Sequence, residues 1–146
     1  MNASLSYERD YNDWLLEQAR LLRKGRMSEV DGATIAEEIE DMVTESEAAL
    51  TSYIRLVLVH LCKLAYMKNR QPVRHWRREI RLFRNQIEDR ILDRYSNPSK
   101  LESLHARAWR GARRELEDVL DDADWRALPK TSPFTLDQVR DHTYFP

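Results

Sequence analysis

Apolar residues recur at every third or fourth position along most of this chain. That spacing is typical of α-helices that bury one face. Four such segments are expected. The first runs from about residue 6 to 24, and the second from about 31 to 67. The third starts after Pro72 and ends at the sequence YSNPSK, and the fourth starts there and carries apolar positions as far as Val119.

Residues that favour helix ends lie at the borders of these segments. Gly25 follows the first segment and suits a left-handed cap, and Asp31 suits the N-terminal cap of the second. Pro72 is tolerated in a first helical turn, while Asn97 and Pro98 fit a cap and a first helical residue. The pattern therefore predicts helices rather than strands.

The second segment changes character along its length. Its first half is amphipathic and acidic, whereas residues 54–66 are apolar on nearly every side. A helix that is apolar all round is usually surrounded by its domain. The predicted inward face of the segment comprises Ile35, Ile39, Met42, Ala49, Tyr53, Leu56, Val57, His60 and Leu64.

The C-terminal region, about residues 125–146, has a different pattern. Pro129 and Pro133 interrupt helix formation, while Thr135 and Gln138 fit a capping box for a short helix. Its four large aromatic side chains predict a strap that packs on the bundle. The sequence as a whole predicts one all-α domain, 1–146, in which a bundle of about four principal helices carries a short C-terminal helix or strap.

The composition of the chain indicates its cellular compartment and the classes of partner that it is not expected to bind. The formal net charge is −1, which disfavours general binding to nucleic acid or membrane surfaces. The start of the chain lacks the layout of a signal peptide, and Cys62 is the single cysteine. One cysteine allows no intrachain disulfide, as is usual in a reducing compartment. We therefore expect a soluble cytoplasmic protein without a membrane partner.

The charges are unevenly distributed despite their balance. Residues 29–47 contain eight carboxylates and no Lys or Arg, whereas residues 68–84 contain seven cations and one carboxylate. Helices of opposite sign attract each other within one chain or between two copies. The predicted interaction surface on the third helix comprises Arg74, Arg77, Arg78, Arg81 and Arg84. Nucleic-acid binding by this helix is a weaker alternative, because Trp76 belongs to its apolar stripe.

A candidate polar site combines Glu37, Glu38 and Asp41 with His60. Carboxylates and a histidine serve in metal-dependent and acid–base catalysis, although a run of charges is usually a solvated helix face. A di-iron bundle needs two Glu-x-x-His pairs, and the sequence has one, which ends at His105. No metal or cofactor is therefore predicted. Three glycines also exclude a glycine-rich phosphate loop.

Several segments together resemble one bacterial family, called domain of unknown function 29. They are YERDYNDWLLEQARLLRKGR, DGATIAEEIEDM, VHLCKLAY, HWRREIRLFRNQI and SPFTLDQVRDHTYFP, and they span Tyr7 to Pro146. The matching positions include His60 and Lys63, which adds Lys63 to the candidate polar site. Phe83 and His75 depart from the pattern, in which Gln and Ser are common. The resemblance implies an all-helical fold and no established activity.

These observations favour a non-enzymatic protein-interaction or regulatory module that binds a protein partner or itself. The uneven charge and the lack of a catalytic constellation support this interpretation. The alternative is a metal-dependent or acid–base enzyme that uses Glu37, Glu38 or Asp41 with His60. Such an enzyme requires these side chains to converge on one solvent-accessible point.

Overall fold

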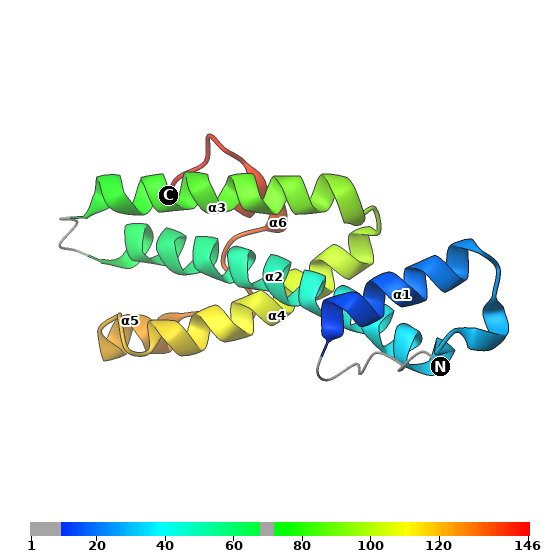
Figure 1. Cartoon of the computed structure of the whole chain (residues 1–146). Helices are drawn as coiled ribbons and strands as arrows, with labels where there is room; N and C mark the ends of the chain where they lie inside the picture. The colour runs from blue at the N-terminus through cyan, green and yellow to red at the C-terminus, as the bar shows by residue number, and fades with distance from the viewer. Residues whose placement is uncertain (1–9, 68–71) are drawn as a thin grey trace. The chain divides into compact units, whose positions relative to one another are not determined.

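The structure, a computed structural model, describes residues 10–67 and 72–146, and these residues contain no strand. The predicted all-α class is therefore confirmed. The elements are α1 (Tyr11–Arg23), a short 3-10 helix η1 (Met27–Glu29), α2 (Gly32–Tyr66), α3 (Val73–Arg94), α4 (Pro98–Leu116), α5 (Asp122–Ala127) and α6 (Leu136–Arg140) (Figure 1).

The helix ends follow the predicted capping residues. Gly25 has a φ of 70°, the left-handed conformation that glycine adopts without strain. The Asp31 carboxylate accepts the backbone N–H of Thr34 at 3.2 Å, and Asn97 caps α4. The predicted start of the first helix near Ser6 lies outside the described residues. The second helix, whose continuity the sequence left open, is continuous.

The chain divides into two compact units between Thr44 and Glu45, within α2. The described part of the first unit contains α1, η1 and the start of α2. Gln18 is buried on α1, and its side-chain oxygen accepts the backbone N–H of Asp31 at 2.8 Å. That bond connects α1 to the residue that caps α2. The single-domain organisation stays a prediction.

The second unit contains a large apolar core. The C-terminal part of α2 is its central element, as predicted, and α3 and α4 supply the other long helices. Gly111 of α4 allows a close approach, because a Cβ atom there would lie 3.0 Å from Cδ of Arg55 on α2. The fully buried side chains of α2 are Leu50, Ile54, Val57, Leu58, Val59, Leu61 and Cys62.

The C-terminal segment packs on this core as a strap, as predicted. Phe134 and Val139 are buried, and α6 contacts α3 (Figure 1). The Trp109 indole N–H donates to the carbonyl of Pro129 at 3.2 Å. The predicted capping box of α6 is present, with Thr135 and Gln138 bonded to each other's backbone. Helix α5 was not predicted from the sequence.

The apolar composition of α2 can also be compared with that of a membrane-spanning helix. By length and composition alone, α2 contains a window apolar enough to cross a membrane. Half of that window is buried inside the structure, and the core helix of a soluble protein meets the same criterion. The apolar C-terminal part of α2 is buried in the core of the second unit.

Candidate functional site

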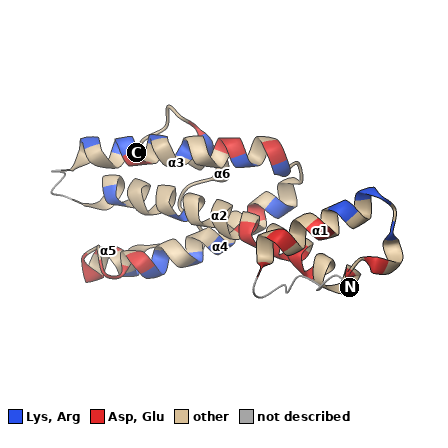
Figure 2. Ribbon diagram, viewed as in Figure 1, with Lys and Arg blue, Asp and Glu red and all other residues tan. Residues whose placement is uncertain are grey.

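The acidic stretch at the start of α2 is a solvent-exposed helix face. Glu37, Glu40 and Asp41 are exposed and form no ion pair with the described residues of their unit. Glu38 accepts a hydrogen bond from the Tyr11 hydroxyl. In Figure 2 the first half of α2 contains several red segments, the colour of Asp and Glu. The carboxylates create a negative surface that is open to a partner.

Apolar side chains on the same turns are exposed as well. Ile39 is 57% exposed, Met42 58% and Val43 56%. Their spacing of three and four residues places them on one helix face, with Glu40 at its edge beside Val43, whereas Asp41 lies toward the opposite side of the helix. We call the exposed residues Ile39, Glu40, Met42 and Val43 the acidic–apolar face, and Asp41 is exposed on the same turn. The sequence analysis placed Ile39 and Met42 on the inward face of the second helix, and this prediction is wrong, because both side chains are exposed.

His60 lies in the second unit and is partly buried. Its Nδ1 donates to the carbonyl of Leu56 at 2.7 Å, and its ring meets the edge of Phe83 at 5.7 Å between centroids. Burial lowers the pKa of His60, and the Leu56 bond opposes that shift. Lys63 lies 5.9 Å from the ring centre of Trp76. Both predicted site residues therefore make packing contacts typical of a helix bundle.

No observation within either unit supports the enzyme hypothesis. Glu37, Glu38 and Asp41 belong to the first unit, and His60 and Lys63 belong to the second. Among residues 10–67 and 72–146, no group of three His, Cys, Asp or Glu side chains is placed to hold a metal. Burial raises the pKa of the Cys62 thiol to about 12, so this thiol is not an activated nucleophile.

The N-terminal half of α3 carries an exposed cationic surface (Figure 2). Arg74, Arg77, Arg78 and Arg81 are exposed, and none forms an ion pair with a described residue of the second unit. They line a pocket of about 600 Å³ together with His75. Neighbouring guanidinium groups repel one another, so this surface favours an anionic partner.

An apolar residue lies within this cationic surface. Leu82 is 52% exposed and lies one turn after Arg78. Leu82 was not singled out in the sequence analysis. It lies outside the apolar stripe of Trp76, Ile80 and Ile87, and that position on the helix could have predicted its exposure. We call Arg74, Arg77, Arg78, Arg81 and Leu82 the arginine face.

Arg84 does not belong to this surface, which corrects the sequence-based grouping. Its side chain is 1% exposed, and it donates to the carbonyls of Val139 at 2.8 Å and Gln138 at 3.0 Å. Burial lowers the pKa of Arg84 to about 10, so the group is still charged at neutral pH. Arg84 is buried because the strap supplies acceptors for its guanidinium, and helical spacing alone does not reveal them.

Phe145 is a further contact that sequence reasoning missed. The guanidinium carbons of Arg77, Arg81 and Arg84 lie 5.2, 5.3 and 5.1 Å from the centre of its ring. Cations are attracted to the face of an aromatic ring at such distances. This contact fixes the strap against α3, while the outer side of α3 stays open around Arg74 and Arg78.

Comparison with known proteins identifies the family of this chain. The family model described as "Domain of unknown function DUF29" matches residues 6–145. The searches of curated proteins and of solved structures gave no match.

Proposed function

Since this chain belongs to the DUF29 family, a name that carries no activity, we propose that it is a non-enzymatic interaction module that associates with a second copy of itself. The acidic–apolar face of one copy binds the arginine face of the other. The observation that carries the proposal is the exposure of Ile39, Met42 and Val43 beside unpaired carboxylates. Exposed apolar groups rimmed by charged residues are typical of protein interaction sites.

The two faces complement each other in charge and in polarity. One face has three apolar side chains beside Glu40, with Asp41 on the same turn, and the other has Leu82 beside four arginines. Opposite charges would guide the encounter and fix the register, while apolar contact would supply most of the affinity. In a two-fold symmetric dimer each copy contributes both faces, so the same contact would occur twice.

A cytoplasmic location is part of this proposal. The single cysteine, Cys62, is buried and unpaired. A free buried thiol is compatible with a reducing compartment.

A charge-swap experiment tests the proposal. The first variant carries Glu40→Arg and Asp41→Arg, and the second carries Arg74→Glu and Arg78→Glu. The first variant has two positive faces, and in the second the two introduced carboxylates cancel the charge of Arg77 and Arg81, so neither variant keeps the original attraction and we expect each to be monomeric. A mixture of the two restores opposite charges at both contacts, so we expect a one-to-one heterodimer. Native mass spectrometry at low salt measures both outcomes.

Matched controls separate this contact from general charge effects. Arg94→Glu with Arg114→Glu, and Glu117→Arg with Asp118→Arg, change the same numbers of charges at exposed positions. We expect these variants to dimerise like the unmodified protein. A monomeric unmodified protein, or a mixture that stays monomeric, contradicts the proposal.

A nucleic acid is the competing occupant of the arginine face, and the same measurements distinguish it. Arg74 and Arg78 are exposed and form no ion pair with a described residue of the second unit, although Nη2 of Arg78 lies 3.3 Å from Nδ1 of His75; exposed cations of this kind are what phosphate binding requires. Co-purified nucleic acid that disappears in Arg74→Glu/Arg78→Glu but remains in Glu40→Arg/Asp41→Arg would replace self-association as the function.

A further inference from the structure

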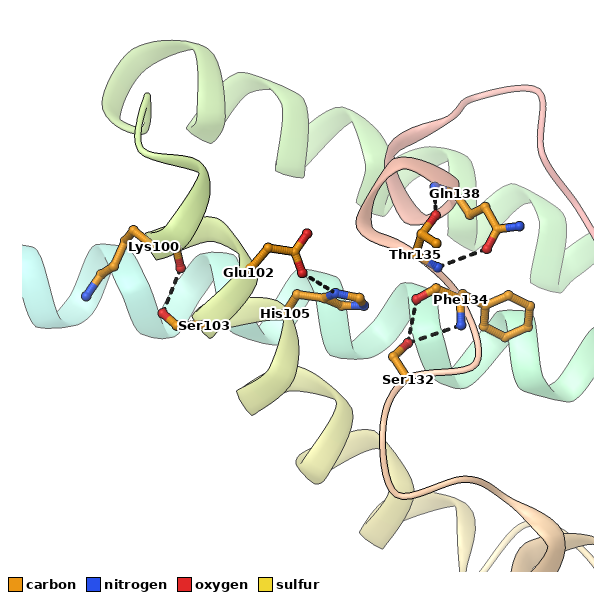
Figure 3. A network of polar contacts seen from close by, with 8 residues as sticks. All are labelled: Lys100, Glu102, Ser103, His105, Ser132, Phe134, Thr135 and Gln138. Carbon is orange, nitrogen blue, oxygen red and sulfur yellow. Dashed lines mark hydrogen bonds and ion pairs between the residues drawn. The ribbon is translucent and has the colours of Figure 1, made fainter.

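A pocket of about 500 Å³ lies between α4 and the strap in the second unit. Its α4 side includes His105, Trp109 and Arg110, and its strap side includes Lys130 and Phe134. Small-molecule sites commonly have volumes of this order and combine an apolar wall with a few polar groups. Figure 3 shows His105 extending from α4 toward the strap.

His105 is the polar group that the fold leaves incomplete. The residue is 6% exposed, and its Nδ1 lies 3.5 Å from a carboxylate oxygen of Glu102. Its Nε2 is buried and has no hydrogen-bond partner among the described residues. Buried polar atoms nearly always have a partner, and one that lacks it is unfavourable. Because Nδ1 faces a carboxylate, it donates there, and Nε2 is left as an acceptor.

The hydroxyl groups of Ser132 and Thr135 beside the pocket are already used by the fold. The Ser132 hydroxyl donates to the carbonyl of Phe134 and accepts its backbone N–H, and the Thr135 hydroxyl accepts from Gln138 (Figure 3). These bonds shape the strap. They leave Nε2 of His105 as the buried group that is free to receive a donor.

The remaining groups define the chemistry of a ligand. Arg110 and Lys130 are exposed and form no ion pair with the described residues, so they offer positive charge to an anion. Trp109 and Phe134 are buried beside them and offer aromatic surface. The single carboxylate of the lining, Glu102, is oriented toward His105.

We propose that this pocket binds a small aromatic carboxylate that carries a hydroxyl group. The hydroxyl donates to Nε2 of His105, the ring packs against Trp109 and Phe134, and the carboxylate pairs with Arg110 and Lys130. The proposal is independent of self-association, because the pocket shares no residue with either interaction face.

The experiment uses 4-hydroxybenzoate and benzoate as probes of the full-length protein. Titrations followed by 1H–15N correlation spectra, up to about 10 mM, would detect even a Kd of about 1 mM. We expect 4-hydroxybenzoate to shift the signals of α4 residues 102–110 and strap residues 130–136. We expect benzoate to bind about tenfold more weakly, because it cannot donate to Nε2.

Two variants assign the roles of the residues. Arg110→Ala with Lys130→Ala should weaken both probes at least about tenfold, since it removes two charge-assisted contacts. His105→Phe should abolish the preference for the hydroxyl group, a readout that a purely structural histidine would not change. Arg94→Ala with Arg114→Ala is the matched control and should bind both probes normally.

Absence of shifts in the pocket at the highest probe concentration overturns the proposal. Equal binding of the two probes by the unmodified protein also overturns it, as does unchanged binding by Arg110→Ala/Lys130→Ala.

Discussion

At the scale of single residues, Arg84 shows how a charged side chain becomes part of a core. Its guanidinium donates to two carbonyls of the strap and lies on the ring of Phe145. A buried charge needs such contacts to offset its lost hydration, and Nη1 of Arg84 has no hydrogen-bond partner among the described residues. The bonds therefore couple the position of the strap to the position of α3.

The substitution Arg84→Lys tests this coupling. Lysine keeps the charge, but its compact ammonium group cannot reproduce the forked geometry that reaches both carbonyls. We expect the free energy of unfolding to fall by about 2 kcal/mol, the value of a lost hydrogen bond to a charged group. Urea denaturation measures this change. The exposed control Arg94→Lys should stay within about 0.5 kcal/mol of the original protein. Equal stability of the two variants would show that Arg84 does not hold the strap.

A second residue-scale prediction concerns pH. Burial lowers the pKa of His60 below its ordinary value of 6.5. As the pH falls below about 6.5, the unfolded chain therefore binds a proton before the folded chain does, and stability decreases. We expect His60→Gln to reduce this loss between pH 7 and pH 5. Thermal denaturation across that range measures it, with the exposed His142→Gln as the control. An identical pH profile for His60→Gln would contradict the assignment.

At the scale of elements, α2 combines two environments in one helix. Its C-terminal part is buried in the core of the second unit, whereas Ile39 and Met42 near its start are exposed. Both parts have apolar residues at helical spacing, so periodicity identifies the helix but not what covers its apolar face. The distinction depends on the neighbouring elements, which the local pattern does not specify.

Removing the exposed apolar groups separates folding from association. Ile39→Ser with Met42→Ser should change the free energy of unfolding by no more than about 0.5 kcal/mol per site, because both side chains are exposed. The same variant should weaken dimerisation at least about tenfold, because each side chain would bury apolar area in the interface. Sedimentation equilibrium measures the association. Leu92→Ser is the control, since Leu92 is exposed outside both faces.

Loss of folding stability without loss of dimerisation would place these side chains in the core rather than in an interface. Dimerisation that is equally weakened by Leu92→Ser would also remove the acidic–apolar face from the contact.

At the scale of the whole molecule, the sequence predicted where the helices begin and end better than it predicted which segments pack against each other. Asn97 and Thr135 marked helix starts because capping depends on residues a few positions away. The short helix α5 has no comparable signal, as Asp121 makes no side-chain cap bond there. The polar pocket beside His105 arises from two segments that the fold brings together. No spacing within either segment reveals that arrangement.

The contact between Arg84 and the strap also has a consequence during protein synthesis. Its two acceptors lie 54 and 55 positions later in the chain. At about 5–20 residues per second, the ribosome completes them roughly 3–11 seconds after Arg84. Helices α3 and α4 are translated first, so for that interval the inward side of α3 presents a positive charge without its carbonyls. We therefore expect strap closure to be a late step in the folding of the nascent chain.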